Sequence, residues 1–363
     1  MRKKVFLNIS LVFMMLFLVS CTKGEEYEKY DIEFFDAFDT ITQIVIYEKD
    51  EKFAGKELKN MQKDFESLHK LFDKYNDYEG INNIKTINDN AGIKAVVVDE
   101  KIYNLIEDSI DHYNNISTKT NIAIGPAVDL WNEYRDLYEE GKTKEQVEEK
   151  MGSYIPTDEE LNSLREFMNM DDIVLNKEEQ SIYLKKKGMQ LDVGSIAKGY
   201  ATELVAQEAE KRGITSALIS AGGNVRIIGS PKNGRDYFSV AVQNPYKKEK
   251  EENPYLTVLG TNENSVVTSG DYQRYFTVDD KRYCHIIDPD SLKPERIYRS
   301  VTIITKDSGL CDYLSTALFL SSYEEGLKIC EDLGVEAIWA FPNGEVLYTK
   351  GAEKLMVEQW KIH

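Results

Sequence analysis

The segment Leu191-Asp-Val-Gly-Ser-Ile-Ala-Lys-Gly199 stands where a strand-like run gives way to a helix. A lysine in the first turn of a helix opposes the helix dipole, so Lys198 is unfavourable unless an anion lies beside it. Asp192 either binds a ligand hydroxyl or caps the helix that begins near Ser195. Gly194 permits a close backbone approach, and the Ser195 carbonyl can face a metal ion. The segment therefore predicts a site for a phosphate group.

A second segment, Asp312-Tyr-Leu-Ser-Thr316, spaces a carboxylate and a hydroxyl four residues apart, which places both on one face of a helix. A solvated polar face is the alternative, although Asp and Thr are both poor residues for a helix interior. Magnesium accepts such a partial set of oxygen ligands and completes its shell with phosphate and water, and calcium uses the same ligand types. Together the two segments predict a metal-dependent enzyme that acts on a nucleotide diphosphate.

Further candidate residues lie in shorter motifs. His285, in Tyr283-Cys-His-Ile-Ile-Asp-Pro289, is either a general base or a core histidine. Arg274 lies between aromatic residues and suits a partly buried charge pair or a planar ligand. Tyr75 either stacks on a planar ring or covers a helix end. The base is left open between His285, Asp271 and a phosphate-bound water.

The hydrophobic pattern mixes strands with helices, and several strands are arranged as hairpins. This mixture predicts an α+β fold rather than a doubly wound parallel sheet. We expect strands at 34–47, 216–220 and 225–228, and helices at 57–75, 100–113, 197–212 and 310–320. Two hairpins are expected, one pairing 182–184 with 190–193 and the other pairing 275–278 with 283–287. The strands 238–242 and 256–259 are expected to continue the sheet.

The N-terminus has the pattern of a secretory signal. Three basic residues at positions 2–4 precede an apolar run over 5–18, which is too short to span a membrane. The following Leu18-Val-Ser-Cys21 resembles a bacterial lipobox, which implies cleavage before Cys21 and attachment of lipid, such as palmitate, to its sulfur. An ordinary signal peptide with an incidental cysteine is the alternative. We expect a signal peptide over 1–20, a lipidated cysteine and tether over 21–30, and a catalytic domain over 31–363, extracytoplasmic and anchored to the cell membrane.

The composition limits the partners and the redox chemistry. The formal net charge of −18 argues against nucleic acid, because phosphate backbones select basic surfaces. An anionic ligand must then be met by a local positive site or by a metal. The chain has four cysteines, and three remain if Cys21 carries lipid, with spacings that match no zinc motif. A disulfide between Cys284 and Cys311 is compatible with an oxidising compartment.

Together these segments resemble the ApbE family of FAD:protein FMN transferases, which implies an α+β architecture with a T-fold-like core, mixed or antiparallel sheets and packed helices. The resemblance covers about Phe34 to Pro342, and eight motifs follow in the family's order. They are Phe38-Asp-Thr40, Phe72-Asp-Lys-Tyr75, Ile124-Gly-Pro126 with Leu130-Trp131, Leu191 to Ala201, Ala221-Gly-Gly223, Thr268-Ser-Gly-Asp-Tyr272, His285-Ile-Ile-Asp-Pro289, and Asp312 to Phe319.

The resemblance implies that Mg²⁺ supports transfer of the FMN half of FAD onto a Thr or Ser of a flavoprotein, such as a redox-pump subunit, with release of AMP. Hydrolysis of FAD by water and simple FAD binding by a lipoprotein are the alternatives. By position, the resemblance implies that Phe38 and Tyr75 would line the FAD pocket, while Lys119, Thr120 and Asn121 would contact the adenosine or ribose end of FAD. Asp192 and Lys198 would hold the nucleotide, and Ile286 would give a backbone contact. The Ser195 carbonyl, Asp312 and Thr316 would bind magnesium, and His285 would be the base.

Two departures from the family pattern fall on nucleotide contacts. Phe38-Asp39 replaces the usual Met-Gly pair, and Asn121 replaces a common aspartate.

Overall fold

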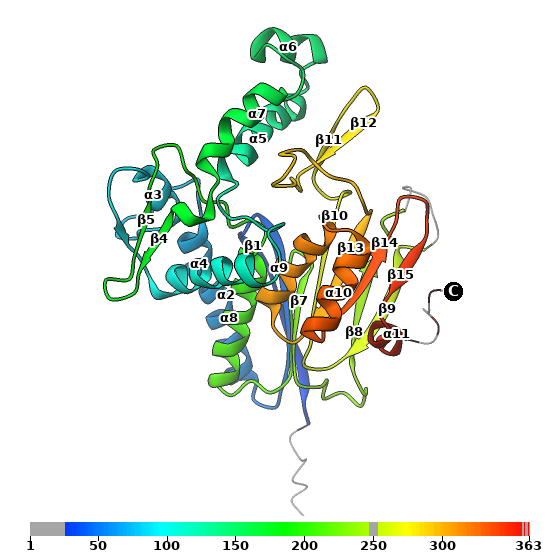
Figure 1. Cartoon of the computed structure of the whole chain (residues 1–363). Helices are drawn as coiled ribbons and strands as arrows, with labels where there is room; N and C mark the ends of the chain where they lie inside the picture. The colour runs from blue at the N-terminus through cyan, green and yellow to red at the C-terminus, as the bar shows by residue number, and fades with distance from the viewer. Residues whose placement is uncertain (1–25, 247–252, 358, 360–361, 363) are drawn as a thin grey trace, which may run out of the picture.

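An eight-stranded sheet forms the centre of the protein, and each neighbouring pair of strands in it is antiparallel (Figure 1). The computed structural model describes residues 26–246, 253–357, 359 and 362. In sheet order the strands are β1 (Glu28–Ala37), β2 (Thr40–Glu48), β6 (Ala217–Ala221), β7 (Asn224–Ile228), β10 (Ser265–Gly270), β13 (Ser300–Thr305), β14 (Glu336–Ala340) and β15 (Val346–Tyr348).

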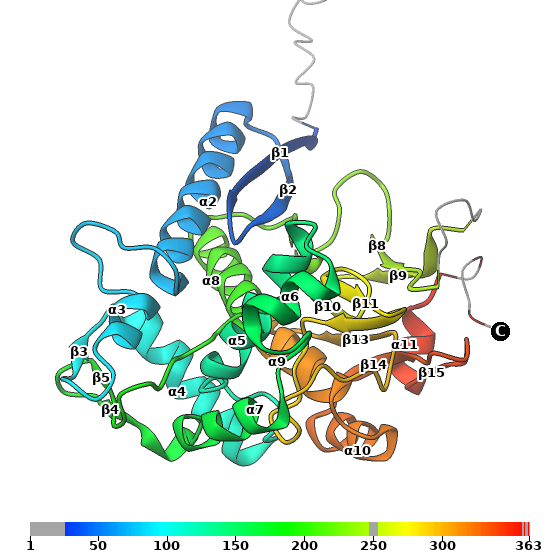
Figure 2. The same cartoon turned by 90° about the horizontal axis from the view of Figure 1, so that it is seen from above.

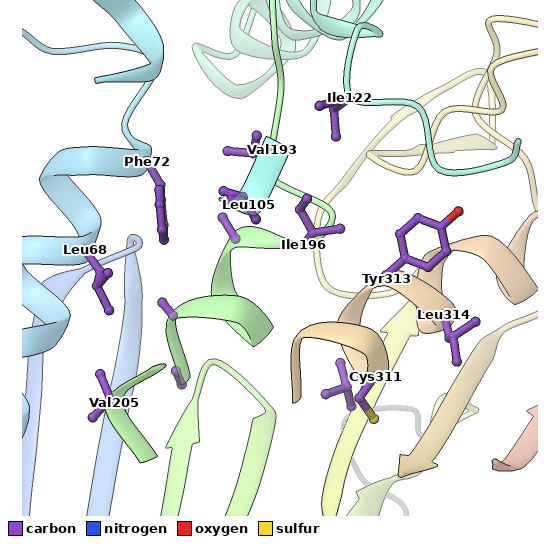
Figure 3. Packing of buried hydrophobic residues seen from close by; sticks show 14 of the residues in the cluster. Leu68, Phe72, Leu105, Ile122, Val193, Ile196, Val205, Cys311, Tyr313 and Leu314 are labelled. Carbon is purple, nitrogen blue, oxygen red and sulfur yellow. The ribbon is translucent and has the colours of Figure 1, made fainter. Parts of the chain in front are cut away.

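One face of this sheet is covered by helices, because its strands present a continuous row of apolar side chains there, among them Ile44, Ile219 and Ile303. The covering helices include α2 (Glu51–Phe72), α8 (Ala197–Lys211), α9 (Ser308–Phe319) and α10 (Tyr323–Leu333). Each fully buried aliphatic or aromatic side chain in such a layer contributes about 1.5–3 kcal/mol. Figure 3 shows how helices distant in sequence share this cluster, through side chains such as Leu68, Phe72, Val205, Cys311 and Leu314.

The opposite face is covered by a two-stranded sheet, β8 (Phe238–Gln243) with β9 (Tyr255–Thr261), and by α11 (Lys350–Leu355). Buried and exposed residues alternate strictly along β8, as expected for a strand with one face on a core. The expectation that these two strands continue the main sheet is therefore wrong: they pack on its face, not on its edge.

A second group of elements lies beyond one end of the sheet (Figures 1 and 2). Its hairpin, β11 (Tyr275–Val278) with β12 (Lys281–Cys284), is joined to α5 (Gly125–Glu139) by stacked rings, with Trp131 and Tyr283 at 5.7 Å and Tyr138 and Phe276 at 5.2 Å between centroids. The elements are α3 (Ile84–Asp89), β3 (Val96–Val97), α4 (Glu100–Asn115), α5 (Gly125–Glu139), α6 (Lys144–Met151), α7 (Asp158–Leu164), the 3₁₀ turns η1 (Arg165–Phe167) and η2 (Met170–Asp172), β4 (Ile173–Asn176), β5 (Ser181–Leu184), β11 (Tyr275–Val278) and β12 (Lys281–Cys284).

The segment 34–47 is a hairpin and not the single strand expected from its composition. Phe38 and Asp39 make the turn with φ values of 56° and 49°, a left-handed conformation that normally selects glycine. The turn was hidden because Phe38 is not a usual turn former, although Asp39 is one. Strand β1 also begins at Glu28, since Glu28 pairs with Glu48, so the end of the expected tether belongs to the sheet.

One other expectation is corrected, and one possibility that the sequence left open is resolved. The strand at 182–184 pairs with β3 and β4 rather than with 190–193, which is irregular and leads to α8. Cys284 and Cys311 are free and buried, as is Cys330, so the structure contains no bond between the first two. The expected signal peptide and Cys21 lie outside the described residues. Among the helices of the described ranges, none has the length and apolarity that a membrane span requires.

Helices α8 and α9 approach each other closely at Gly199. A Cβ built on Gly199 would lie 2.3 Å from Cβ of Asp312 and 2.3 Å from the carbonyl oxygen of Ser308. Both contacts are with rigid parts of α9, so no side-chain movement can relieve them. A residue without a side chain is therefore required for these two helices to meet.

We predict that Gly199→Ala lowers the free energy of unfolding by about 2–3 kcal/mol, because it overpacks this contact. The control is Gly55→Ala in α2, where an added Cβ has nothing within 4 Å. That change should raise the free energy of unfolding by about 0.5–1 kcal/mol, through helix propensity. Equilibrium denaturation of both variants measures the difference, and equal effects would contradict this account of the α8–α9 contact.

Candidate active site

The backbone at the start of α8 is diverted from the regular helical pattern. The N–H of Gly199 donates to Oδ2 of Asp312 on α9 at 2.8 Å, rather than to the carbonyl of Ser195 four residues earlier. No donor to the Ser195 carbonyl is found among the described residues. The Ser195 carbonyl therefore has no partner in this part of the chain, and the first turn of α8 is held instead by the carboxylate of Asp312.

Asp312 is a buried carboxylate, with 4% of its surface exposed. Burial raises the pKa of Asp312, while Lys198, the Gly199 N–H and the Asn224 amide act in the opposite direction. Within the described part of the chain, no cationic nitrogen lies within the 4 Å of an ion pair with it. A buried carboxylate without a close counter-ion is costly, so the site favours a cation.

Hydroxyl groups extend the site from Asp312 along α9. Thr316 lies one turn beyond Asp312, and its Oγ1 is 3.4 Å from Oγ of Ser269 on β10. Ser269 is also 2.7 Å from Oγ of Ser315. Neither serine was assigned a role from sequence, although Ser269 lies in a motif noted for its hydroxyls and Ser315 shares a helix face with Asp312 and Thr316. These contacts place the Thr316 hydroxyl among oxygens rather than in an apolar core.

The oxygens at this junction fit a magnesium ion. The unpaired Ser195 carbonyl, the Asp312 carboxylate and the Thr316 hydroxyl are all hard ligands. Nowhere in the described residues do three or more His, Cys, Asp or Glu side chains gather to hold a metal. An ion here would therefore rely on backbone, hydroxyl and substrate oxygens, as magnesium does at phosphate sites.

Lys198 lies in the first turn of α8, as expected. Its Nζ donates only to the Gly194 carbonyl, at 3.3 Å, and no carboxylate pairs with it among the described residues. Its backbone N–H also lacks an acceptor there. A free ammonium group and a free N–H at a helix N-terminus form a suitable site for an anion.

Asp192 has a different environment from the one expected of a free ligand-binding carboxylate. Its Oδ1 accepts from the Gly194 N–H at 2.9 Å, which shapes the turn, but the cap residue of α8 is Ile196. Its Oδ2 pairs with Lys74 at 2.7 Å, and Lys74 also pairs with Asp129 at 2.6 Å. Lys74 therefore joins three segments of the chain beneath the glycine loop.

Lys74 was not assigned a role from sequence, although it lies inside the Phe72-Asp-Lys-Tyr75 motif. Its side chain is only 8% exposed. Burial on its own would lower the pKa of Lys74, but Asp192 and Asp129 raise it above the ordinary value. The sequence did offer a signal, because Lys74 directly follows an amphipathic helix. A lysine buried at such a position requires carboxylate partners.

His285 follows β12 directly, and its ring reaches solvent. Its Nδ1 lies 3.2 Å from the Arg274 carbonyl, which also accepts from the His285 N–H at 3.1 Å. Desolvation by the surrounding protein lowers the pKa of His285 below its ordinary value, and the nearby charges of Lys198 and Arg274 lower it further. A neutral imidazole with Nε2 available is the form needed for a general base.

The other protein candidate for the base is enclosed. Asp271 is fully buried, with Oδ2 paired to Arg299 at 2.7 Å and to Arg296 at 3.0 Å. This geometry leaves Asp271 no access to a substrate hydroxyl. Arg274, by contrast, is exposed and has no ion pair among the described residues, so its charge is available near His285.

The residues expected to line the flavin pocket lie where the β1–β2 turn meets the end of α2. Phe38 packs edge-on against His69 at 5.5 Å, and its N–H donates to Nδ1 of His69 at 3.3 Å. Tyr75 is 62% exposed, and the ammonium of Lys74 lies 5.1 Å from its ring centroid. Such a large exposed ring beside the glycine loop remains free to stack on a ligand.

The residues expected at the adenosine end already have protein partners. Lys119 pairs with Asp288 and Asp290, both at 2.7 Å. The buried Thr120 hydroxyl donates to the Tyr313 carbonyl at 3.3 Å. The amide of Asn121 bonds to the Met168 carbonyl and the Ala123 N–H. These three side chains hold segments of the protein together.

Ile286, unlike Lys119, Thr120 and Asn121, keeps a hydrogen-bonding group without a protein partner among the described residues. Its carbonyl accepts from the Glu295 N–H, while no acceptor for its own N–H lies among the described residues. The expected backbone contact from Ile286 therefore has an available donor.

Comparison with known proteins agrees with the fold and the motifs. Residues 38–339 match the model of the ApbE family. The chain belongs to this family, and its α+β fold and its class as a transferase enzyme are confirmed. A Klebsiella pneumoniae FAD:protein FMN transferase is 30% identical over 288 residues, covering 77% of this chain and 83% of the relative. A Treponema pallidum protein of the same name is 29% identical over 282 residues, covering 74% and 73%.

Solved structures agree with this fold. The ApbE protein of Thermotoga maritima superposes with a TM-score of 0.77 at 25% identity, covering 91% of this chain and all of the other. A flavin transferase ApbE from Vibrio cholerae, in a variant with a histidine replaced by glycine, gives a TM-score of 0.72 at 20% identity, covering 90% and 99%.

We predict that Lys74→Gln lowers the free energy of unfolding by about 2–3 kcal/mol, because it leaves Asp192 partly buried without its cation. The control is Lys85→Gln, whose partners Asp77 and Asp89 are exposed and whose loss should cost less than about 1 kcal/mol. Chemical denaturation at neutral pH compares them. A Lys74 variant as stable as the Lys85 variant would show that the three-segment ion pair is not structural.

Proposed function

We propose that this protein is a magnesium-dependent FAD:protein FMN transferase, which attaches FMN from FAD to a Thr or Ser of an acceptor flavoprotein and releases AMP. The observation that carries this proposal is the hydrogen bond from the Gly199 N–H to Asp312. It leaves the Ser195 carbonyl without a donor from the described residues and holds the Asp312 carboxylate buried at the start of α8, the helix that carries Lys198. The relatives that carry this activity in their names support the reaction.

In the proposed reaction, the acceptor hydroxyl oxygen attacks the phosphorus of the FMN half of FAD. The bond from this phosphorus to the bridging oxygen breaks, and AMP leaves with that oxygen. A new phosphoester bond joins FMN to the acceptor, and the hydroxyl proton passes to Nε2 of His285. Lys198 and the N-terminus of α8 balance the negative charge of the diphosphate.

Magnesium, when bound by Ser195, Asp312 and Thr316, would supply further charge neutralisation at the diphosphate. Arg274 adds a second free cation near His285. The net charge of −18 repels an anionic substrate, and these local positive groups offset that repulsion at the site. The acceptor class, a redox-pump type subunit, is proposed from the family resemblance.

We also propose that the mature protein is extracytoplasmic and held at the cell membrane by lipid on Cys21. The basic, apolar and small-residue order of the N-terminal segment supports this location. Palmitate labelling should then be lost in Cys21→Ala.

We predict that Asp312→Asn abolishes metal-dependent FMN transfer, with at least a hundredfold loss of rate, because the charge that holds the cation is removed. The amide oxygen can still accept from the Gly199 N–H, so the fold should be kept. In-gel flavin fluorescence of a threonine-bearing acceptor, with FAD and Mg²⁺, measures transfer, and the control is Ser322→Ala at the remote cap of α10.

The products separate the alternatives. A dark acceptor with AMP released by the wild-type protein would indicate FAD hydrolysis. A dark acceptor with intact FAD would indicate a binding protein. Full transfer by Asp312→Asn would contradict the assigned metal site.

We predict that the acidic limb of the kcat/KM profile lies below pH 6.5, because the pKa of His285 is lowered in the free enzyme. The base is neutral, and active, at pH values above its lowered pKa, and activity falls as the pH drops through that value. In His285→Gln this limb should disappear together with most of the rate. A limb that persists unchanged in the variant would assign the titration to another group.

A further inference from the structure

A cleft of about 750 Å³ lies between the loop that precedes α7, strand β12 and the segment 293–297. Its walls combine rings and prolines, such as Tyr154, Pro156, Tyr283 and Pro294, with several basic side chains. None of the residues assigned above to FAD or magnesium lines it. The cleft is therefore a separate feature of the molecule, on the hairpin that carries His285.

The cleft is close to the proposed base. Tyr283 lines the cleft and lies two residues before His285, so their Cα atoms are at most about 7 Å apart. The His285 N–H donates to the Arg274 carbonyl, which continues the ladder between Tyr275 and Cys284 by one residue. Tyr283 and His285 consequently point to the same face of the hairpin.

The edge of β12 in this cleft has free backbone groups. Because Arg274 and His285 form a hydrogen-bonded pair, alternation in an antiparallel ladder turns the N–H and C=O of Arg282 away from β11. Neither group has a partner in the part of the chain that the structure describes. Arg282 itself lines the cleft, so an extended chain lying there has a backbone donor and acceptor to meet.

The charge of the cleft is opposite to that of the whole protein. Its lining contains four basic residues and two acidic ones, in a chain of net charge −18. Lys293 is paired with Asp158 at 2.6 Å, and Arg296 with the buried Asp271. Lys281 is exposed, has no ion pair among the described residues and lies 5.0 Å from the Tyr283 ring centroid. It is the available charge of the cleft.

We propose that this cleft binds an extended, acidic segment of the acceptor protein and brings its hydroxyl side chain to His285. The proposal rests on the proposed function, since only a transferase must admit a protein hydroxyl as well as FAD. Aromatic and proline walls with a free strand edge suit a peptide, and the cleft has no glycine loop of the kind that cradles phosphate. Entry here keeps the acceptor clear of the nucleotide residues that follow α2 and of those at the start of α8, because none of them lines the cleft.

Peptide binding tests the proposal without requiring turnover. The probes are a fluorescein-labelled threonine peptide flanked by glutamates and its counterpart flanked by lysines, titrated with the mature protein by fluorescence anisotropy. We expect the glutamate peptide to bind more tightly, with a Kd raised roughly fivefold or more by Lys281→Glu. The matched control is Lys59→Glu, an exposed lysine on α2, which should leave the Kd unchanged. Unfolding midpoints confirm that both variants fold.

Equal binding of the two peptides, no binding of either, or equal Kd values for Lys281→Glu and the wild type would overturn the proposal. The FMN-transfer assay separates its failure from that of the proposed function. If the wild type transfers FMN but Lys281→Glu and the wild type have the same peptide Kd, the proposed peptide site is overturned and the proposed transferase function stands. Lys281-dependent binding without any transfer to a threonine acceptor keeps the peptide site and overturns the transferase.

Discussion

The hydrogen bond from the Gly199 N–H to Asp312 is the constraint on which the rest of the site depends. It satisfies an N-terminal donor of α8 with a side chain from α9, and it is possible only because Gly199 has no Cβ. The same bond frees the Ser195 carbonyl and fixes the carboxylate in a buried position. One contact thus sets the helix packing and prepares oxygen ligands for a cation.

A strongly acidic protein that binds an anionic nucleotide must concentrate its positive charge. Two lysines close to the site are paired with carboxylates, Lys74 with Asp192 and Lys119 with Asp288. Lys198 and Arg274 are exceptions, and both lower the pKa of His285. Two cations without an ion pair in the described ranges therefore lie beside the proposed base, while Lys74 and Lys119 hold together the segments around it.

The sequence was sufficient for the α+β class, the α8 and α9 helices and the family, because each depends on local periodicity or on motif order. It failed where a distant partner decided the outcome. The turn at Phe38-Asp39 is imposed by pairing of β1 with β2, against the local preference of Phe38. Lys74 and Ser269 acquire their roles only through contacts with Asp192 and Thr316, far along the chain. Spacing within one segment cannot reveal such contacts.

The most direct test of the metal and diphosphate site is anomalous diffraction from crystals grown with FAD and with Mn²⁺ in place of Mg²⁺. We expect an anomalous peak within coordination distance of the Ser195 carbonyl, Asp312 and Thr316, in contact with the FAD diphosphate. A peak bound elsewhere, or an FAD diphosphate seated without a metal at the α8–α9 junction, would contradict it.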